Sequence, residues 1–316
     1  MVQNQGSHLF VIDPVERLNL AWDTSIKMAF ALHQLGETIY ICTGRELTRS
    51  LHPTDTYAMA RRVQFGKKTA EMSTSKTERV ALVDFSAIHM RREPPYDLDY
   101  IATLWILDSV ASRTSVINSP RALLEINEKL CILDFPLFTK PAIVSSDAEE
   151  LMAFAKDRCS SNIVIKPLGL YGGRGIEHID DERGLLERLH VATMNGKESR
   201  MVQEFNPAIH KGEVRAFTVG GKPVAWCLKI PKTGEFLANT RAGSALADYQ
   251  PTERDVDVAT GVAETLLKKG VFFAGIDMIG GWLSEVNITC PALLSPDRAS
   301  LKGLDQIAKA IVSYTT

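Results

Sequence analysis

The chain has 316 residues, of which 45% are hydrophobic and 23% charged, and its formal net charge is −2. This composition is typical of a soluble globular protein with two or three subdomains and argues against a disordered chain. Because the sequence pI is near 6.4, there is no basic footprint for nucleic acid or for an anionic membrane surface. We therefore expect any anionic ligand to be held by a local cluster of positive side chains.

The five cysteines are widely scattered, and none forms a Cys-x-x-Cys pair. This pattern favours reduced thiols over a disulfide framework or a zinc site. No basic and apolar signal region precedes Phe10, and no apolar run approaches the length that spans a membrane. The sequence therefore predicts a cytoplasmic protein.

The first elements are predicted to be a strand, a helix and a strand, at residues 8–13, 26–35 and 38–42. This order predicts a parallel α/β sheet. The polar residues Asp23, Thr24 and Ser25 come at the start of the helix, beyond the carboxyl end of a strand, where open α/β sheets bind ligands. Without further context, a helix cap is the favoured explanation.

Residues 57–85 have the pattern of antiparallel strands around Gly66. The basic pair Arg91 and Arg92 then precedes two prolines, which forbid a central strand. Such a pair in a rigid turn is suited to binding a carboxylate, and it is also typical of a solvated loop. Further elements are predicted at 100–107 (helix), 115–118 (strand), 120–130 (helix) and 147–159 (helix).

A buried-type strand that carries Lys166 leads into a loop that contains Gly172, Gly173 and Gly175. Glycines let the backbone approach phosphate oxygens closely and turn its N–H groups toward them. The spacing matches neither the P-loop nor the dinucleotide fingerprint, and a strand at 176–180 follows instead of a helix. The loop is therefore either a flap over an anion or a mobile turn.

The second half is predicted to contain strands, one long polar loop and two helices. We expect strands at 201–207, 213–219 and 223–230, a loop at 231–248, and helices at 252–269 and 298–314. Because side chains alternate along a strand, Glu213, Arg215 and Phe217 share one face. A loop as long as 231–248 is usually a lid or disordered.

Residues 274–291 have the pattern of two strands joined at Gly280 and Gly281, which is a common signal for a β-hairpin. The length of the turn decides which side chains meet. A two-residue turn pairs Asp277 with Ser284 and turns the next residue, a glutamate, to the opposite face.

A three-residue loop instead pairs Asp277 with Glu285 and leaves both on one face with Asn287. Two carboxylates and an amide on one face supply the oxygen ligands that suit Mg²⁺, which takes its other ligands from water and substrate phosphates. Only this second register forms a metal site. The alternative is a solvated sheet face.

Several ordered segments of the chain are similar to the prokaryotic glutathione synthetases, over nearly the entire length. They are Asp13-Pro14, Asp23-Thr-Ser25, Arg92-Glu-Pro-Pro-Tyr-Asp97, Asn127-Glu-Lys-Leu130, Ile165-Lys-Pro167, Asn206-Pro-Ala-Ile209, Gly275-Ile-Asp277 and Glu285-Val-Asn-Ile-Thr289. This family has the ATP-grasp fold, in which two α+β subdomains clasp ATP and magnesium. The resemblance implies a mixed α/β and α+β chain: an N-terminal parallel α/β (pre-ATP-grasp) substrate domain in residues 1–120, a small lid subdomain in 121–200, and a large subdomain with the metal site in 201–316.

The resemblance also implies the residues of a nucleotide and metal site. Lys129 and Lys166 would hold the phosphates, and the glycines Gly172, Gly173 and Gly175 would close over them. The end of a strand, at Gln203, Glu204, Phe205 and Asn206, would contact adenine, with Glu213 on the ribose. Mg²⁺, with Mn²⁺ as the alternative ion, would be bound by Asp277, Glu285 and Asn287.

The implied reaction begins when a carboxylate attacks the γ-phosphate of ATP to form an acyl phosphate and ADP. Lys166 and Arg215 are the candidate catalytic residues, because positive groups and magnesium offset the negative charge that spreads in this transition state. An amine then displaces phosphate to form an amide. The flap and the lid must exclude water, which would hydrolyse the intermediate.

The candidate substrate contacts are Asp23, Thr24, Ser25, Arg92, Lys229, Asn239, Arg241 and Thr289. In the substrate part of the site the chain departs from the family pattern. Lys229 and Leu237 stand at or near positions where the family commonly has arginine, and a lysine lacks the bidentate fork of arginine. The residues at 290–297 also differ, which implies an altered pocket for the accepting amino acid.

The resemblance implies a glutathione synthetase, which joins γ-glutamylcysteine to glycine. A sister ATP-grasp ligase for another dipeptide or amino-acid pair is the alternative, and a nucleotide-binding regulator without turnover is a third hypothesis. The expected partners are small-molecule substrates and, by resemblance, further copies of the chain in a homo-oligomer, in which a tetramer is the expected state.

Overall fold

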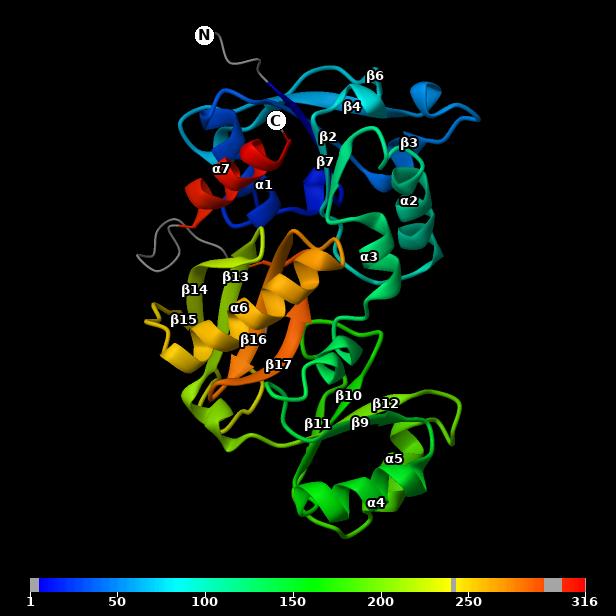
Figure 1. The fold of residues 1–316 in the computed structure, drawn as a ribbon, viewed down its shortest axis with the longest axis vertical. Coiled ribbons are helices and arrows are strands. Elements are labelled where there is room, and N and C mark those ends of the chain that lie inside the picture. The colour runs from blue at the N-terminus through cyan, green and yellow to red at the C-terminus, as the bar shows by residue number, and fades with distance from the viewer. Residues whose placement is uncertain (1–5, 240–242, 293–302, 316) are drawn as a thin grey trace.

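The computed structural model describes residues 6–239, 243–292 and 303–315. These residues form three β-sheets (Figure 1). The N-terminal sheet lies at one end of the molecule, a four-stranded sheet at the other, and a five-stranded sheet from the last third of the chain lies between them. No helix within the described ranges combines the length and apolar composition needed to cross a membrane.

The N-terminal sheet has eight strands, and β1 lies near its centre. Its strands are β1 (Ser7–Val11), β2 (Thr38–Cys42), β3 (Leu47–Thr48), β4 (Tyr57–Gln64), β5 (Ser73–Thr74), β6 (Glu78–Ala81), β7 (Ala87–Met90) and β8 (Ser115–Ile117). β1 pairs in parallel with β2 and β7, and β7 with β8. The predicted parallel α/β sheet is thus confirmed, and β4 adds the predicted antiparallel pairings with β5 and β6.

Three helices belong to this part: α1 (Thr24–Gln34), α2 (Leu98–Asp108) and α3 (Pro120–Glu125). The prediction of one continuous helical region over 120–130 was wrong. α3 ends at Glu125, and a separate 3₁₀ turn spans Leu130–Asp134. Between them the Asn127 side chain accepts hydrogen bonds from the amides of Lys129 and Leu130, both at 3.0 Å. An asparagine that caps its own backbone in this way competes with helix continuation.

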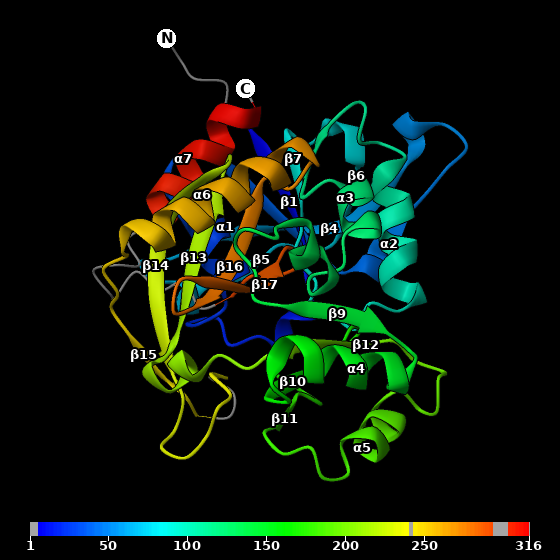
Figure 2. The same ribbon diagram turned by 60° about the horizontal axis from the view of Figure 1, so that its bottom comes forward.

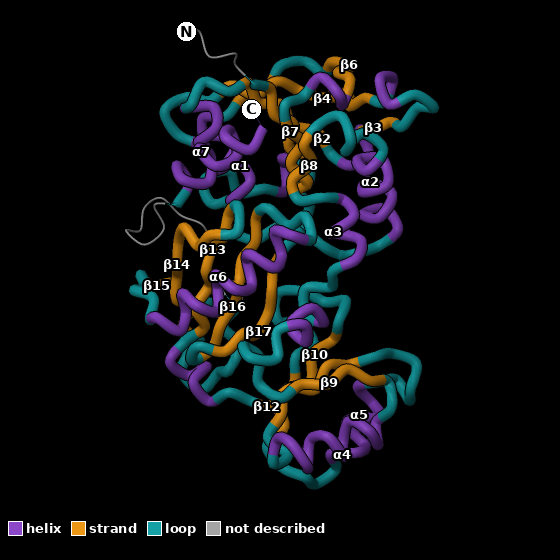
Figure 3. Tube along the Cα trace, in the orientation of Figure 1, coloured by secondary structure: helices purple, strands orange, loops and turns teal. Residues whose placement is uncertain are grey.

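The four-stranded antiparallel sheet has the order β11-β10-β12-β9. Its strands are β9 (Ala142–Ser145), β10 (Ile163–Pro167), β11 (Glu177–Ile179) and β12 (Arg200–Glu204). The helices α4 (Ala148–Cys159) and α5 (Leu185–Ala192) lie together beyond it, at the end of the molecule (Figure 3). The sequence pattern did not identify β9 or α5. β9 is short, and its four side chains are all half-buried, so it has no alternation to detect.

The five-stranded antiparallel sheet has the order β15-β14-β13-β16-β17. Its strands are β13 (Glu213–Val219), β14 (Lys222–Ile230), β15 (Ala245–Ala247), β16 (Phe273–Ile279) and β17 (Trp282–Asn287). α6 (Glu253–Lys268) lies along one face (Figure 2). The expectation of an unbroken loop at 231–248 was wrong, because β15 pairs with the edge of β14.

The last helix, α7 (Leu304–Thr315), lies beside α1 of the N-terminal sheet (Figure 1). Its buried residues Leu304, Ile307 and Ile311 join the apolar cluster that contains Ile26 and Met28 of α1. The predicted start of this helix, at 298, lies outside the described residues. The chain therefore returns to its N-terminal part after it has formed the central sheet.

Candidate active site

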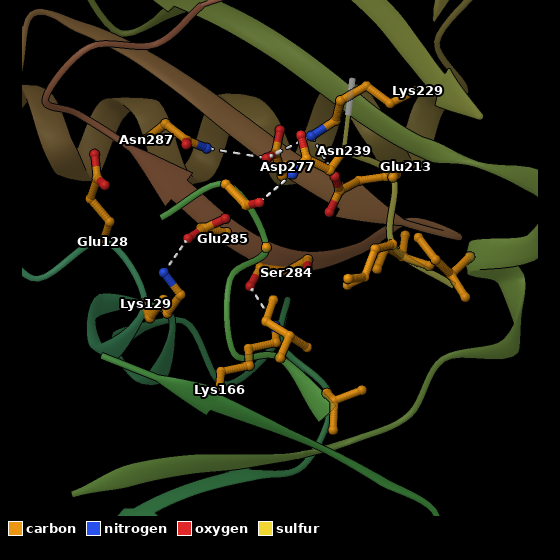
Figure 4. A pocket seen from close by; sticks show the side chains of 18 of the residues that line it. Glu128, Lys129, Lys166, Glu213, Lys229, Asn239, Asp277, Ser284, Glu285 and Asn287 are labelled. Atoms are coloured by element: carbon orange, nitrogen blue, oxygen red, sulfur yellow. Dashed lines mark hydrogen bonds and ion pairs between the residues drawn. The ribbon is translucent and has the colours of Figure 1, made fainter. Parts of the chain in front are cut away.

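A cleft of about 250 Å³ is lined by residues of both the four-stranded and the five-stranded sheets (Figure 4). Most of the candidate site residues line it, although they are distant in the sequence. They are Lys129, Lys166, Gly172, Gly173, Gln203, Glu204, Phe205, Asn206, Glu213, Arg215, Lys229, Asn239, Asp277, Glu285, Asn287 and Thr289. Gly175, Asp23, Thr24, Ser25 and Arg92 do not line it, and Arg241 lies outside the described residues.

The hairpin of β16 and β17 combines the two registers that the sequence allowed. Near the turn, Met278 pairs with Leu283, as a two-residue turn requires, and both turn glycines have positive φ. The register then shifts, so that Asp277 pairs with Glu285. Ser284 is the extra residue of this β-bulge. The bulge leaves Asp277 and Glu285 on one face, which a two-residue turn alone does not do.

Lys166 reaches the cleft from β10 and is held by both sheets. Its ammonium donates to Gln203 Oε1 at 2.8 Å and to the backbone oxygen of the bulge residue Ser284 at 3.2 Å. Burial lowers the pKa of this lysine, although the glutamates across the cleft oppose the effect. The bulge thus supplies a carbonyl that orients a cation toward the cleft.

Asp277 is 1% exposed and lies among cations from two other strands. Arg215 of β13 forms a bidentate pair with it, at 2.7 Å from Nε and 2.6 Å from the terminal nitrogen. Lys229 of β14 lies 3.0 Å from the same carboxylate and also pairs with Glu213. Burial alone would raise the pKa of Asp277, but Arg215 and Lys229 hold it well below its usual range.

Lys129 connects β17 with the glycine-rich loop. Its ammonium lies 2.8 Å from Glu285 Oε1 and donates to the backbone oxygen of Leu170 at 2.6 Å. Gly172 and Gly173 follow in the loop with φ of 65° and 75°, a region that L-amino acids with a side chain rarely adopt. Asn239 donates to the carbonyl of Gly172 and so joins the segment after β14 to the loop.

One end of the cleft is apolar. Val164, Phe205 and Ile209 form a small buried cluster there, with Phe236 packed against it. The predicted strand end at Gln203–Asn206 forms this wall, and Lys140, which the sequence reasoning missed, pairs with Glu204 at 2.7 Å. An apolar slot beside a few polar groups suits a planar ring such as adenine.

The N-terminal candidates do not line the cleft. Arg92 is paired with Asp99 at 2.9 Å and donates to Thr103 at 2.8 Å, both on α2. Its neighbour Arg91 is buried and donates to Ser25 Oγ at 3.0 Å. The Ser25 hydroxyl lies 3.9 Å from the thiol of Cys290, which does line the cleft.

The other two residues of this predicted group lie at the start of α1. Asp23 caps the helix by accepting from the Ile26 amide at 2.9 Å, which is the alternative that the sequence left open. The Thr24 hydroxyl is buried and has no hydrogen-bond partner within the described part of the chain.

Glu128 is a cleft residue that sequence reasoning overlooked. Its Oε1 accepts hydrogen bonds from the amides of Ile288 and Thr289, at 2.7 and 2.9 Å, and from the Thr289 hydroxyl at 3.0 Å. Burial raises its pKa, and Glu285 adds to the effect. The only signal in the sequence was its position beside Lys129, because no periodicity separates such a carboxylate from a surface glutamate.

The donor set of the predicted metal site suits Mg²⁺ shared with phosphate. The Asn287 amide nitrogen lies 3.2 Å from Asp277 Oδ2, and Glu285 lines the same cleft (Figure 4). Among the described residues, no group of three or more His, Cys, Asp or Glu is placed to hold a metal by itself. Mg²⁺ commonly takes one or two carboxylates from a protein and completes its shell with water and phosphate oxygens.

Two family models of known proteins match consecutive parts of the chain. The N-terminal domain of prokaryotic glutathione synthetase matches residues 7–123, and its ATP-grasp domain matches residues 128–296. The chain belongs to the prokaryotic glutathione synthetase family. As a member, it is an ATP-dependent carboxylate–amine ligase with an N-terminal domain followed by an ATP-grasp fold.

Relatives of this glutathione synthetase family member span most of its length. It is 33% identical to the glutathione synthetase of Ralstonia nicotianae, over 90% of this chain and 87% of the relative. It is 32% identical to that of Synechocystis sp., over 89% and 91%.

Solved structures share its fold at lower identity. The ATP-grasp ligase PsnB with a minimal precursor has a TM-score of 0.64 at 16% identity, over 99% of each chain. The D-cycloserine synthetase DcsG has a TM-score of 0.66 at 15% identity, over 98% of this chain and 100% of DcsG.

Proposed function

We propose that this enzyme joins γ-glutamylcysteine to glycine through an acyl phosphate, with release of ADP and phosphate. The observation that carries the proposal is the single cleft in which Lys129, Lys166 and Arg215 face the oxygen donors Asp277 and Glu285. Cations and oxygen donors gathered in one cleft are the groups that transfer of a phosphoryl group to a carboxylate requires.

Each positive residue has a distinct place in this reaction. Lys166 and Lys129, held by both walls, would bind the phosphates of ATP, and Arg215 would hold the transferred phosphoryl group on the acyl donor. When bound, Mg²⁺ would neutralise phosphate charge through Asp277, Glu285 and Asn287, and Mn²⁺ could replace it because it takes the same oxygen ligands.

Other parts of the cleft would bind the nucleoside of ATP and exclude water. The apolar wall around Phe205 supports adenine binding, and Glu213 is our candidate for the ribose. We propose that Gly172, Gly173 and Gly175 close over the phosphates and that Asn239 holds them there. Exclusion of water matters because an acyl phosphate that meets water is lost by hydrolysis.

We also propose the larger organisation of the protein. Residues 1–120 would bind the acyl donor, 121–200 would form the lid, and 201–316 would carry the metal site. The contacts of Ser25 with Arg91, and its approach to Cys290, support participation of the first part in the substrate pocket. We further propose a cytoplasmic homotetramer, which light scattering on the purified protein would test.

A specific observation favours a second candidate, a sister ligase with another acceptor. Lys229 is committed to Glu213 and Asp277, and Cys290 and Ala292 form the wall next to Thr289. These residues stand where the family pattern differs, so the acceptor pocket is the part of the site most open to change. A regulator without turnover is disfavoured by the family relationship.

The test is phosphate release from ATP measured with a panel of dipeptide donors and amino-acid acceptors. We expect the largest stimulation with γ-glutamylcysteine plus glycine, and stimulation by another pair instead would favour the sister ligase. Lys166→Ala should abolish turnover without loss of the fold, because the alanine leaves no buried charge behind. Near-normal turnover in this variant would remove Lys166 from the mechanism.

A further inference from the structure

The segment Asn127–Lys129 connects three parts of the active site. The Asn127 side chain donates to the backbone oxygen of Leu168 at 3.1 Å, and Lys129 donates to that of Leu170 at 2.6 Å. Both acceptors lie between β10 and the glycines of the loop. Glu128 lies between Asn127 and Lys129 in the sequence. Its side chain contacts the end of β17 instead of the loop.

Glu128 binds the end of β17 through both its backbone and its side chain. Its carbonyl accepts from the Val286 amide at 3.1 Å, and its Oε1 accepts from the amides of Ile288 and Thr289 and from the Thr289 hydroxyl, at 2.7–3.0 Å. One residue therefore satisfies three backbone donors in the stretch that follows Glu285. Asn287, which lies within this stretch, is fixed by the bonds on either side of it.

We propose that Glu128 is a positioning residue. It acts through its neighbour Lys129 and through β17, because it holds the two in a fixed position relative to each other. The bonds to Val286 and Ile288 fix the position of residues 127–129 along β17. In this position the Lys129 ammonium lies 2.8 Å from Glu285 Oε1. Mutation of residues that orient metal ligands without binding the metal themselves typically lowers metal affinity or activity 10- to 100-fold.

Loss of the carboxylate would have a local consequence. Without it, the amides of Ile288 and Thr289 and the Thr289 hydroxyl lose their acceptor, and a buried donor without a partner is costly. The end of β17 would loosen, and Lys129 would no longer be held opposite Glu285. A glutamine at this position would keep a carbonyl oxygen with two lone pairs in the same place.

Hydrogen exchange measured on the purified chain without substrates tests the anchor directly. In Glu128→Ala, the amides of residues 286–289 should exchange at least tenfold faster, while those of β13 stay unchanged. Glu128→Gln should remain close to the wild type. Unchanged exchange in Glu128→Ala would overturn the proposal. If the alanine variant fails to fold, Glu128→Asp, which keeps the charge but is too short to reach, should show the faster exchange.

Kinetics provide the second test and rest on the proposed function. We expect Glu128→Ala to raise the KM for ATP and the half-saturating Mg²⁺ concentration roughly tenfold, with a smaller change in kcat, and Glu128→Gln to restore most of the loss. If Gln is as impaired as Ala, the charge itself acts on the substrate and the positioning role is wrong. If the wild type does not use γ-glutamylcysteine and glycine, the proposed function fails, but the exchange experiment still decides the role of Glu128.

Asp255 offers a matched control. Its Oδ2 also accepts from a backbone amide and a hydroxyl of one threonine, Thr252, and from the Tyr249 hydroxyl, but it lies at the start of α6 and outside the cleft. Asp255→Ala should lower stability without a change in the KM for ATP. An equal rise of KM in this control would show that any buried carboxylate anchor has the same effect, and would overturn a specific role for Glu128.

Discussion

Asp277 is surrounded by groups from three strands, and none of them is a sequence neighbour. Arg215 and Lys229 compensate its charge, and the Asn287 amide donates to the same oxygen that Lys229 approaches. In this arrangement the carboxylate needs no metal to remain ionised inside the protein.

Asp277→Asn should affect both catalysis and stability. The amide removes one charge from a buried group of ions, and loss of one partner of such a pair costs about 3–5 kcal/mol in the free energy of unfolding. Turnover should fall roughly 100-fold or more, because a preorganised electrostatic contact is lost. Urea unfolding and steady-state phosphate release measure the two effects. Normal stability in this variant would show that Arg215 and Lys229 find other partners.

The neighbouring arginines show what sequence reasoning misses at this scale. The pattern placed both arginines in a rigid turn, and the family resemblance singled out Arg92. Arg92 is paired with Asp99, whereas Arg91 reaches Ser25 beside the cleft. The two residues have the same chemistry, and only the direction of each side chain separates them. Direction depends on packing against α2, which local sequence does not encode.

At the scale of elements, the β16–β17 hairpin shows the same limit. The glycines predicted the turn correctly, and alternation predicted strands on both sides. The bulge at Ser284 could not be read from the sequence, because no local residue type requires it. It arises where β17 meets the Lys166 ammonium and the Glu128 segment, so it depends on contacts from two other parts of the fold.

Deletion of Ser284 tests whether the bulge serves the site. Without this residue Glu285 still pairs with Asp277, because it follows Leu283 directly, but the carbonyl that accepts from Lys166 is lost. A hydrogen bond to a charged group contributes about 1.5–3 kcal/mol, so turnover should fall roughly 10- to 100-fold. The melting temperature should also fall, because a buried ammonium loses one of its acceptors.

Ser284→Ala is the matched control for this deletion. It keeps the backbone carbonyl and should retain nearly normal rates in the same phosphate-release assay. A deletion variant that is as active as the wild type would show that the carbonyl does not orient Lys166.

The order of elements in the N-terminal sheet was predictable from the sequence, but the packing of the last helix against that part of the chain was not. Strand–helix–strand order gave the parallel N-terminal sheet, since such crossovers favour parallel pairing. The return of α7 to α1 joins residues almost 300 positions apart. Ile307 and Ile311 would complete an amphipathic helix against any apolar surface, so their pattern predicts a helix but not its partner.

A buried pair of histidines links stability of the whole fold to pH. His8 of β1 lies 3.1 Å from His89 of β7, ring nitrogen to ring nitrogen, and both side chains are at most 1% exposed. Burial lowers the pKa of His8 to about 4 and that of His89 well below its ordinary value. Glu37, at 3.3 Å from His8, favours the charged ring, but the burial outweighs it.

The sign of the effect follows from the two states. Below pH 6.5 the unfolded chain binds protons at these histidines and the folded chain does not, so the free energy of unfolding falls as the pH drops from about 6.5 to 4. For His8 alone the loss is on the order of 3 kcal/mol. Urea unfolding at pH 7, 6 and 5 should show this fall. His8→Gln should make it shallower, whereas His52→Gln, at an exposed position, should not. Equal slopes in wild type and His8→Gln would show that other groups control acid stability.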